Sequence, residues 1–171
     1  MKYLLVIDVQ TDFITGSLAN KDAEKIVEPL AEKIRTFDGQ VIVTLDIHDM
    51  NYLNTQEGKM LPVEHCIMEH GYMPPNEIVD AVQSRSEDSV TAIEKHTFGT
   101  MEWESFGITK DDEIYICGLC TDICVVTNAL IVKTLFPETP IHVIGDLCAG
   151  TSKAKHDEAL DVMQSCQIIL D

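Results

Sequence analysis

A chain of 171 residues is long enough to form one domain that buries its core without disulfide bonds. Its 12 Lys and Arg residues against 29 Asp and Glu residues give a formal net charge of −17, so neither nucleic acid nor an anionic membrane surface is an expected partner. No apolar run approaches the roughly 20 residues of a membrane span. The apolar start of the chain is ended by Asp8 and is followed by no secretory cleavage site, so we expect a cytoplasmic protein.

Strand-like segments follow one another along the whole chain. They are expected at residues 3–8, 40–45, 90–94, 113–118, 141–145 and 167–170. Their nearly continuous apolar character is typical of parallel strands that are buried on both faces.

Helical patterns lie between these strands. The first has apolar residues at helical spacing from Ala23 to Ile34, with Asn20 or Asp22 available as a cap, whereas Pro29 predicts a kink or a late start. Further helices are expected at 76–84, 121–135 and 152–164. The alternation predicts a single domain over residues 1–171, a doubly wound three-layer α/β/α fold with a six-stranded, mostly parallel sheet. The irregular stretch 46–75 is long enough to be a functional loop.

Three reactive side chains lie at the ends of predicted strands. Asp8 closes the first strand, Lys95 follows the third, and Cys124 lies just past the fourth, where a helix is expected to begin. In an open parallel sheet these ends converge on one rim, where such folds place their sites. The helix N-terminus and Lys95 would favour a Cys124 thiolate, and Asp8 could serve as general base and acid. The pattern therefore predicts a cysteine hydrolase.

The motifs around these residues resemble those of the isochorismatase-like cysteine hydrolases, a superfamily that includes nicotinamidases, carbamoylsarcosine amidases and isochorismatases. The resemblance covers nearly the whole chain and is carried by Ile7-Asp8-Val9-Gln10-x-Asp12-Phe13, Glu94-Lys95 and Gly118-Leu119-Cys120-Thr121-Asp122-Ile123-Cys124-Val125. It implies a catalytic triad of Asp8, Lys95 and Cys124, a thioester intermediate on a small amide, and an oxyanion hole formed by the backbone N–H groups of Cys120 and Cys124. It also implies a cis peptide bond at Leu119-Cys120, and a homo-oligomer is possible because family members often form dimers or tetramers.

A second group of residues suits a metal ion. Asp46 and His48 are two residues apart at a strand end, so their side chains can face the same way and chelate one ion. This pair resembles the metal-binding nicotinamidase branch of the superfamily, which implies His65 as the third ligand, a divalent metal that is most simply Zn²⁺, and a role for the metal in orienting a ring nitrogen of the substrate. Asn54 or His70 could supply a fourth ligand. The alternative is an acidic surface loop whose histidines are solvated or structural.

The predicted substrate pocket departs from that of nicotinamidases. Phe13 matches a pocket aromatic of the family, but Leu61 occupies the place of the tryptophan that usually stacks on the substrate ring. The chain's one tryptophan, Trp103, could cover the pocket instead. A small carboxamide is the expected substrate, and nicotinamide is the first compound to test.

Three other functions fit parts of the sequence. The chain could be a metal-free isochorismatase or carbamoyl-amide hydrolase, or a non-catalytic binding module with the same fold. The pair Cys117-x-x-Cys120 has the spacing of a redox or zinc pair, although Cys117 lies in a predicted buried strand and packing is the simpler interpretation. The six cysteines are expected to be reduced.

Overall fold

Six parallel strands form one sheet in the order β3-β2-β1-β4-β5-β6 in the computed structural model, which describes residues 1–68 and 71–171. The strands are β1 (Lys2–Ile7), β2 (Gln40–Asp46), β3 (Val90–Lys95), β4 (Glu113–Leu119), β5 (Ile141–Ala149) and β6 (Ile169–Leu170). The predicted six-stranded α/β fold is confirmed, with every pairing parallel. The central strand β1 is the best buried, since Leu4 through Ile7 have no exposed surface.

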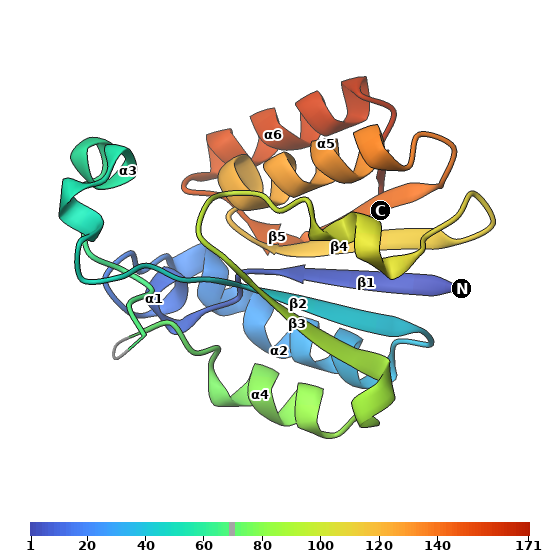
Figure 1. Ribbon diagram of the computed structural model, residues 1–171, viewed down its shortest axis with the longest axis horizontal. Helices are drawn as coiled ribbons and strands as arrows, with labels where there is room; N and C mark the ends of the chain where they lie inside the picture. The colour runs from blue at the N-terminus through green and yellow to red at the C-terminus, as the bar shows by residue number, and fades with distance from the viewer. Residues whose placement is uncertain (69–70) are drawn as a thin grey trace.

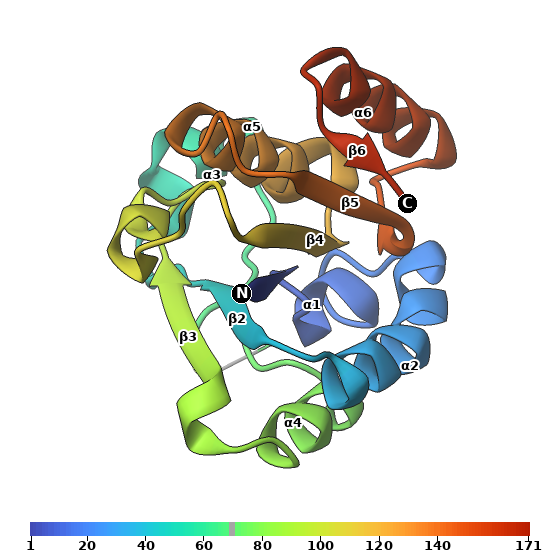
Figure 2. The same ribbon diagram turned by 90° about the vertical axis from the view of Figure 1, so that its right-hand side faces the viewer.

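Helices cover both faces of the sheet, which makes three layers (Figures 1 and 2). On one face lie α2 (Lys21–Thr36) and α4 (Asn76–Gln83), and on the other lie α5 (Val126–Leu135) and α6 (Lys153–Ser165). The short helices α1 (Thr11–Ile14) and α3 (Gln56–Met60) belong to the connections at the carboxyl end of the sheet. Among the described residues, the connections also contain 3₁₀ helices at Tyr52–Asn54, Glu87–Ser89 and Glu102–Phe106. No helix within the described ranges is both long and apolar enough to cross a membrane.

Two helices differ from their predicted form. Helix α2 begins at Lys21 and runs through Pro29, so the predicted late start is wrong; the side chain of Asn20 caps it by accepting a hydrogen bond from the amide of Asp22. The predicted helix 121–135 is divided into a π-helical turn, Thr121–Val125, and α5. Short π-helical segments occur often at functional sites, and Cys124 lies in this one.

The strand order reverses beside β1, because the chain builds β2 and β3 on one side and then returns to place β4 on the other. Such a switch point leaves a crevice at the carboxyl ends of the strands. Gly118 allows β4 to approach β1 closely there: its φ is +118°, and a Cβ atom would lie 2.1 Å from the carbonyl oxygen of Ile7. The segments that follow β1 and β4 therefore meet at this crevice.

Candidate active site

The structure brings Asp8, Lys95 and Cys124 together at the carboxyl end of the sheet. Lys95 Nζ lies 2.7 Å from Asp8 Oδ2 and 3.6 Å from Cys124 Sγ, and all three residues are buried. Strand β2 separates β3 from β1, so a side chain on β3 must reach across one strand to contact Asp8. The long stem of lysine makes this possible and places its charge between the carboxylate and the sulfur.

Asp8 is held in an unusual conformation. Its φ is +46°, in the left-handed region that residues other than glycine seldom adopt, and its Oδ1 accepts a hydrogen bond from Thr44 Oγ1 (2.6 Å). Burial raises the pKa of Asp8, while the charge of Lys95 opposes the rise. A carboxyl group with a raised pKa is well suited to accept and return a proton near neutral pH.

The surroundings of Cys124 oppose ionisation of its thiol. Burial, and next to it the negative charge of Asp8, raise the pKa of the Cys124 thiol well above its ordinary value, although Lys95 opposes this rise. Loss of water around the sulfur therefore opposes the thiolate that the helix N-terminus and Lys95 would favour. The side chain of Asp8 interacts with the thiol and is placed to accept its proton.

The backbone before Cys124 turns sharply. The peptide bond Leu119-Cys120 is cis, as the resemblance implies. The amides of Ile123 and Val125 both donate to the carbonyl oxygen of Cys120, whereas no hydrogen bond joins the Cys120 amide to another described residue. The Cys120 amide is therefore free to meet an oxyanion.

The three predicted metal ligands also lie together. The ligand atoms of Asp46, His48 and His65 are all within 4.8 Å of one another. The two oxygens of Asp46 face different partners, since Oδ1 accepts from Lys95 (3.2 Å) and Oδ2 faces His48 Nε2 (3.0 Å). His65 uses Nδ1 on the carbonyl oxygen of Val63 (2.8 Å), which leaves its Nε2 for an ion.

The electrostatics of the cluster favour a cation. Burial alone would raise the pKa of Asp46, but the hydrogen bond from His48 and the charge of Lys95 lower it, so Asp46 is ionised. For His48, a base, burial alone would lower the pKa, but the hydrogen bond to Asp46 and the negative charge of Asp46 raise it. Tyr52 packs against both histidine rings and is itself buried, which fixes their orientation.

Glu57 is a member of this cluster that the sequence analysis missed. Its Oε1 lies 3.6 Å from His48 Nε2 and 3.9 Å from His65 Nε2. Glu57 lies in the first turn of α3, which Thr55 caps by accepting from the amide of Gly58. Asn54, a predicted alternative, is exposed and donates to Asn51 Oδ1 (2.7 Å). His70, the other alternative, lies outside the described residues.

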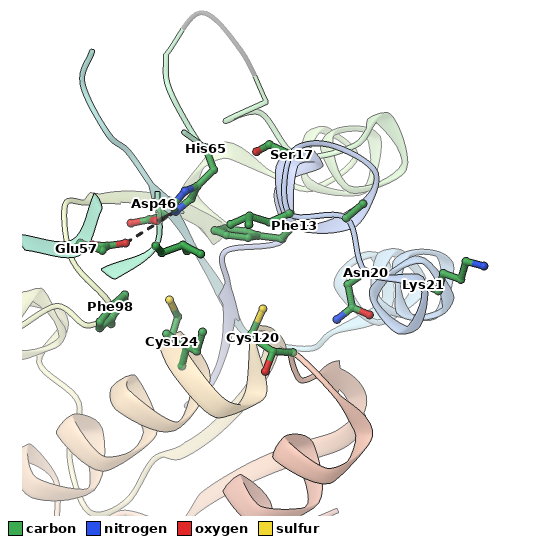
Figure 3. Close-up of a pocket in the computed structure, with 15 residues that line it drawn as sticks. Phe13, Ser17, Asn20, Lys21, Asp46, Glu57, His65, Phe98, Cys120 and Cys124 are labelled. Atoms are coloured by element: carbon green, nitrogen blue, oxygen red, sulfur yellow. Dashed lines mark ion pairs between the residues drawn. The ribbon is translucent and has the colours of Figure 1, made fainter. Parts of the chain in front are cut away.

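A cavity of about 520 Å³ opens onto these groups (Figure 3). Phe13, Asp46, His65, Cys120 and Cys124 all line it, so the predicted pocket aromatic Phe13, the thiol and two metal ligands face the same space. In Figure 3, Phe13 lies between the His65 side and the Asn20 side of the cavity.

Trp103 is not in this cavity, which corrects the prediction that it covers the pocket. Its side chain has no exposed surface, and its Nε1 donates to Asn128 Oδ1 (3.1 Å). The 3₁₀ helix Glu102–Phe106 folds the ring into the core, where it is buried more completely than it would be over an open pocket.

Asn128 is a second residue that the sequence analysis missed. It is fully buried, donates to the carbonyl oxygens of Cys124 (2.8 Å) and Phe98 (3.0 Å), and accepts from the amide of Thr100 (3.2 Å) as well as from Trp103. It therefore fixes the turn that bears Cys124 to the segment that follows Lys95. Its position four residues after Cys124, on the same helix face, is the signal that could have pointed to it.

Comparison with known proteins agrees with this geometry. The sequence model of the isochorismatase domain family matches residues 2–171. A nicotinamidase from Saccharomyces cerevisiae is 24% identical over 188 residues, covering 82% of this chain and 85% of the yeast protein.

Solved structures share the fold over nearly the whole chain. A nicotinamidase/pyrazinamidase from Bacillus subtilis has a TM-score of 0.85 at 21% identity, covering 99% of this chain and 98% of that one. A pyrazinamidase from Pyrococcus horikoshii in complex with zinc has a TM-score of 0.81 at 23% identity, with the same coverage of 99% and 98%. An N-carbamoylsarcosine amidase from Thermoplasma acidophilum has a TM-score of 0.76 at 21% identity, covering 99% and 94%.

Proposed function

Because the chain belongs to the isochorismatase domain family, we propose that it is a cysteine-dependent amidohydrolase that holds a divalent metal, most simply Zn²⁺, and hydrolyses a small carboxamide. The first candidate reaction is the conversion of nicotinamide to nicotinate and ammonia. The observation that carries the proposal is the contact of Lys95 with both Asp8 and Cys124 at the floor of a cavity that also exposes Asp46 and His65. Six free thiols suit a reducing compartment, so we place the enzyme in the cytoplasm.

The proposed reaction proceeds in two halves. Asp8 takes the thiol proton of Cys124 as the sulfur attacks the carbonyl carbon, and the backbone amides of Cys120 and Cys124 bind the oxyanion that forms. Asp8 then gives the proton to the amide nitrogen, the C–N bond breaks, and ammonia leaves a thioester on Cys124. A water molecule attacks the thioester while Asp8 accepts its proton, and the acid product leaves as the proton returns to the sulfur.

Lys95 supplies the positive charge beside Asp8 and Cys124. Burial would lower the pKa of Lys95, but the adjacent Asp8 and Cys124 raise it, so its ammonium group stays charged. A positive charge at 3.6 Å stabilises negative charge on the Cys124 sulfur as the proton moves to Asp8.

The cluster of Asp46, His48 and His65 fits a metal ion by its chemistry. Two imidazoles and a carboxylate are the ligand set of an open zinc site, and Glu57 offers a second carboxylate beside it. A bound ion would supply a Lewis-acidic site for a ring nitrogen of the substrate. The zinc named for the Pyrococcus pyrazinamidase supports this assignment.

The variant His48→Ala is expected to lose the metal while the fold persists. After dialysis against a metal-free buffer, the wild type should keep roughly one divalent ion per chain and the variant far less, because an imidazole ligand is gone. His142→Ala is the matched control, since His142 pairs with Asp171 away from the site. The metal content of each protein is measured by inductively coupled plasma mass spectrometry. An unchanged content in His48→Ala would show that the cluster of Asp46, His48 and His65 does not hold the ion.

Nicotinamide hydrolysis tests the proposed function directly. Zinc-loaded protein is expected to release ammonia and nicotinate in equal amounts, with a rate that saturates with nicotinamide. The fold is shared with an N-carbamoylsarcosine amidase, so the assay also includes a carbamoyl-amino acid, measured with and without metal. Metal-independent release from the carbamoyl compound alone would favour that second function, and release from neither would contradict the amidase proposal for both substrates.

A further inference from the structure

The cavity is larger than a pyridine carboxamide requires. It has a volume of about 520 Å³, within the range of roughly 300–1,000 Å³ that holds drug-sized ligands, whereas a single ring with one carboxamide is much smaller. Residues 17–21 and Thr151 also line the cavity. In Figure 3, Asn20 and Lys21 lie beyond Cys120 as seen from Cys124. We call the part between Cys120 and residues 17–21 the distal limb.

The wall of the cavity is mainly apolar and partly open. Its apolar side chains include Phe13, Leu18, Ala19, Leu61, Phe98 and Ile123. Leu61 is 38% exposed and Phe98 is 42% exposed, which is free apolar surface beside the nucleophile. Trp103 adds nothing to this wall, because it is packed in the core.

The distal limb is preformed rather than a gap in a loose loop. Asp12 anchors the segment after α1, since its Oδ1 accepts from the amide of Ser17 (3.2 Å) and its carbonyl oxygen from the amide of Leu18 (2.9 Å). The side chain of Asn20 then ties this segment to the opposite wall by donating to the carbonyl oxygen of Gly150 (2.6 Å). A ligand in the distal limb would therefore bind without ordering this segment. Preorganisation favours binding mainly because that conformational entropy is not lost.

The side chains of Asn20 and Thr151, at the far end of the limb, already have protein partners. Asn20 Oδ1 accepts from the amide of Asp22, and Thr151 donates through both its amide and its hydroxyl to Asp122. The ammonium end of Lys21 points away from the cavity (Figure 3). These three side chains therefore offer little to a polar ligand, whereas Leu18 and Ala19 provide apolar contact in the limb.

We propose that the substrate is an uncharged carboxamide with an apolar extension that fills the distal limb. The inference rests on the proposed amidase function for the place of the carboxamide at Cys124, and on the cavity alone for the extension. The extension can belong to the acyl side or to the amide nitrogen, which would make the leaving group ammonia in the first case and an alkylamine in the second. Either extension would place an apolar group in the distal limb, and the experiment below distinguishes the two.

The test compares nicotinamide with nicotinamides that carry a butyl chain on the ring or on the amide nitrogen. Each buried methylene is worth about fourfold in affinity, which corresponds to about 0.8 kcal/mol, so at least a tenfold advantage is expected for one butyl series. Two readouts are used: kcat/KM with the zinc-loaded wild type, and Kd with zinc-loaded Cys124→Ala, which binds without turnover.

These readouts separate the two proposals. If Cys124→Ala binds neither butyl series more tightly than nicotinamide, the apolar extension is wrong, whatever the wild type hydrolyses. If Cys124→Ala prefers a butyl series but the wild type hydrolyses none of the compounds, the limb assignment stands and the amidase function fails.

A blocking variant ties the effect to the distal limb. Ala19 lines the limb and is exposed, so Ala19→Phe should fill it and abolish the tenfold advantage of the butyl compound. Ala154→Phe is the matched control, because Ala154 is equally exposed on α6 but does not line the cavity. An advantage that survives Ala19→Phe would place the extension elsewhere and overturn the proposal.

Discussion

Cys124→Ala is expected to abolish amide hydrolysis, with kcat reduced at least about 10⁴-fold, while the protein stays folded. Its sulfur is the one nucleophilic atom of the proposed triad, and it lies 3.6 Å from Lys95 Nζ. The substitution removes a single buried atom, so the free energy of unfolding should fall by only about 1 kcal/mol. Ammonia release and thermal unfolding, measured on the same preparation, check both parts.

Cys117→Ala is the matched control for this experiment. Cys117 is also a buried thiol, but it lies within β4 with its Sγ 3.7 Å from the carbonyl oxygen of Leu5. The amide hydrolysis activity of Cys117→Ala should be close to that of the wild type. Loss of activity in Cys117→Ala together with retention in Cys124→Ala would contradict the proposed mechanism and favour chemistry at the Cys117-x-x-Cys120 pair.

The position of the candidate site could be predicted because it depends on strand ends. Asp8 and Cys124 follow the buried strands β1 and β4, Lys95 ends the edge strand β3, and parallel strands bring their carboxyl ends to one rim. Asp46 and His48 could be paired for the same reason, since they lie at the end of β2. Local patterns were enough wherever a regular strand positions the side chain.

The rest of the site depends on packing that sequence patterns do not encode. Glu57 reaches the histidines only because a short helix interrupts the irregular stretch 46–75, where no apolar periodicity marks an element. Trp103 is directed into the core by Asn128, a contact between segments 25 residues apart. The raised pKa of the Cys124 thiol follows from its burial, which the expected helix N-terminus could not reveal.

Lys95→Met is expected to be the most damaging substitution for both stability and activity. Lys95 Nζ contacts Asp8 Oδ2 (2.7 Å), Asp46 Oδ1 (3.2 Å) and the carbonyl oxygen of Thr97 (2.9 Å), and its side chain is almost completely buried. Methionine has a similar length but leaves two buried carboxylates without their cation. Breaking a buried ion pair in this way costs about 3–5 kcal/mol, which chemical denaturation at neutral pH should show.

The loss of stability in Lys95→Met should be larger at neutral pH than at acidic pH. Burial already raises the pKa of Asp8, and Lys95 opposes that rise, so removing Lys95 raises the pKa of Asp8 further. The folded variant then binds more protons than the unfolded chain between the two pKa values of Asp8, and its stability falls as pH rises through that window. The deficit relative to the wild type should therefore be largest near pH 7.5 and smaller near about pH 5. Lys110→Met, a substitution of an exposed lysine, should show no such pH dependence.

A double-mutant cycle separates the charge of Lys95 from its packing. If the cost of Lys95→Met comes from an uncompensated Asp8 carboxylate, then adding Asp8→Asn should restore part of the lost stability, and the two effects should differ from additivity by about 1–3 kcal/mol. Lys95→Arg keeps the charge but replaces a point charge with a planar fork, so it should be more stable than Lys95→Met and still lose most activity. Strictly additive effects in the cycle would mean that Lys95 and Asp8 are not coupled, and the triad would lose the interaction on which its proton transfer depends.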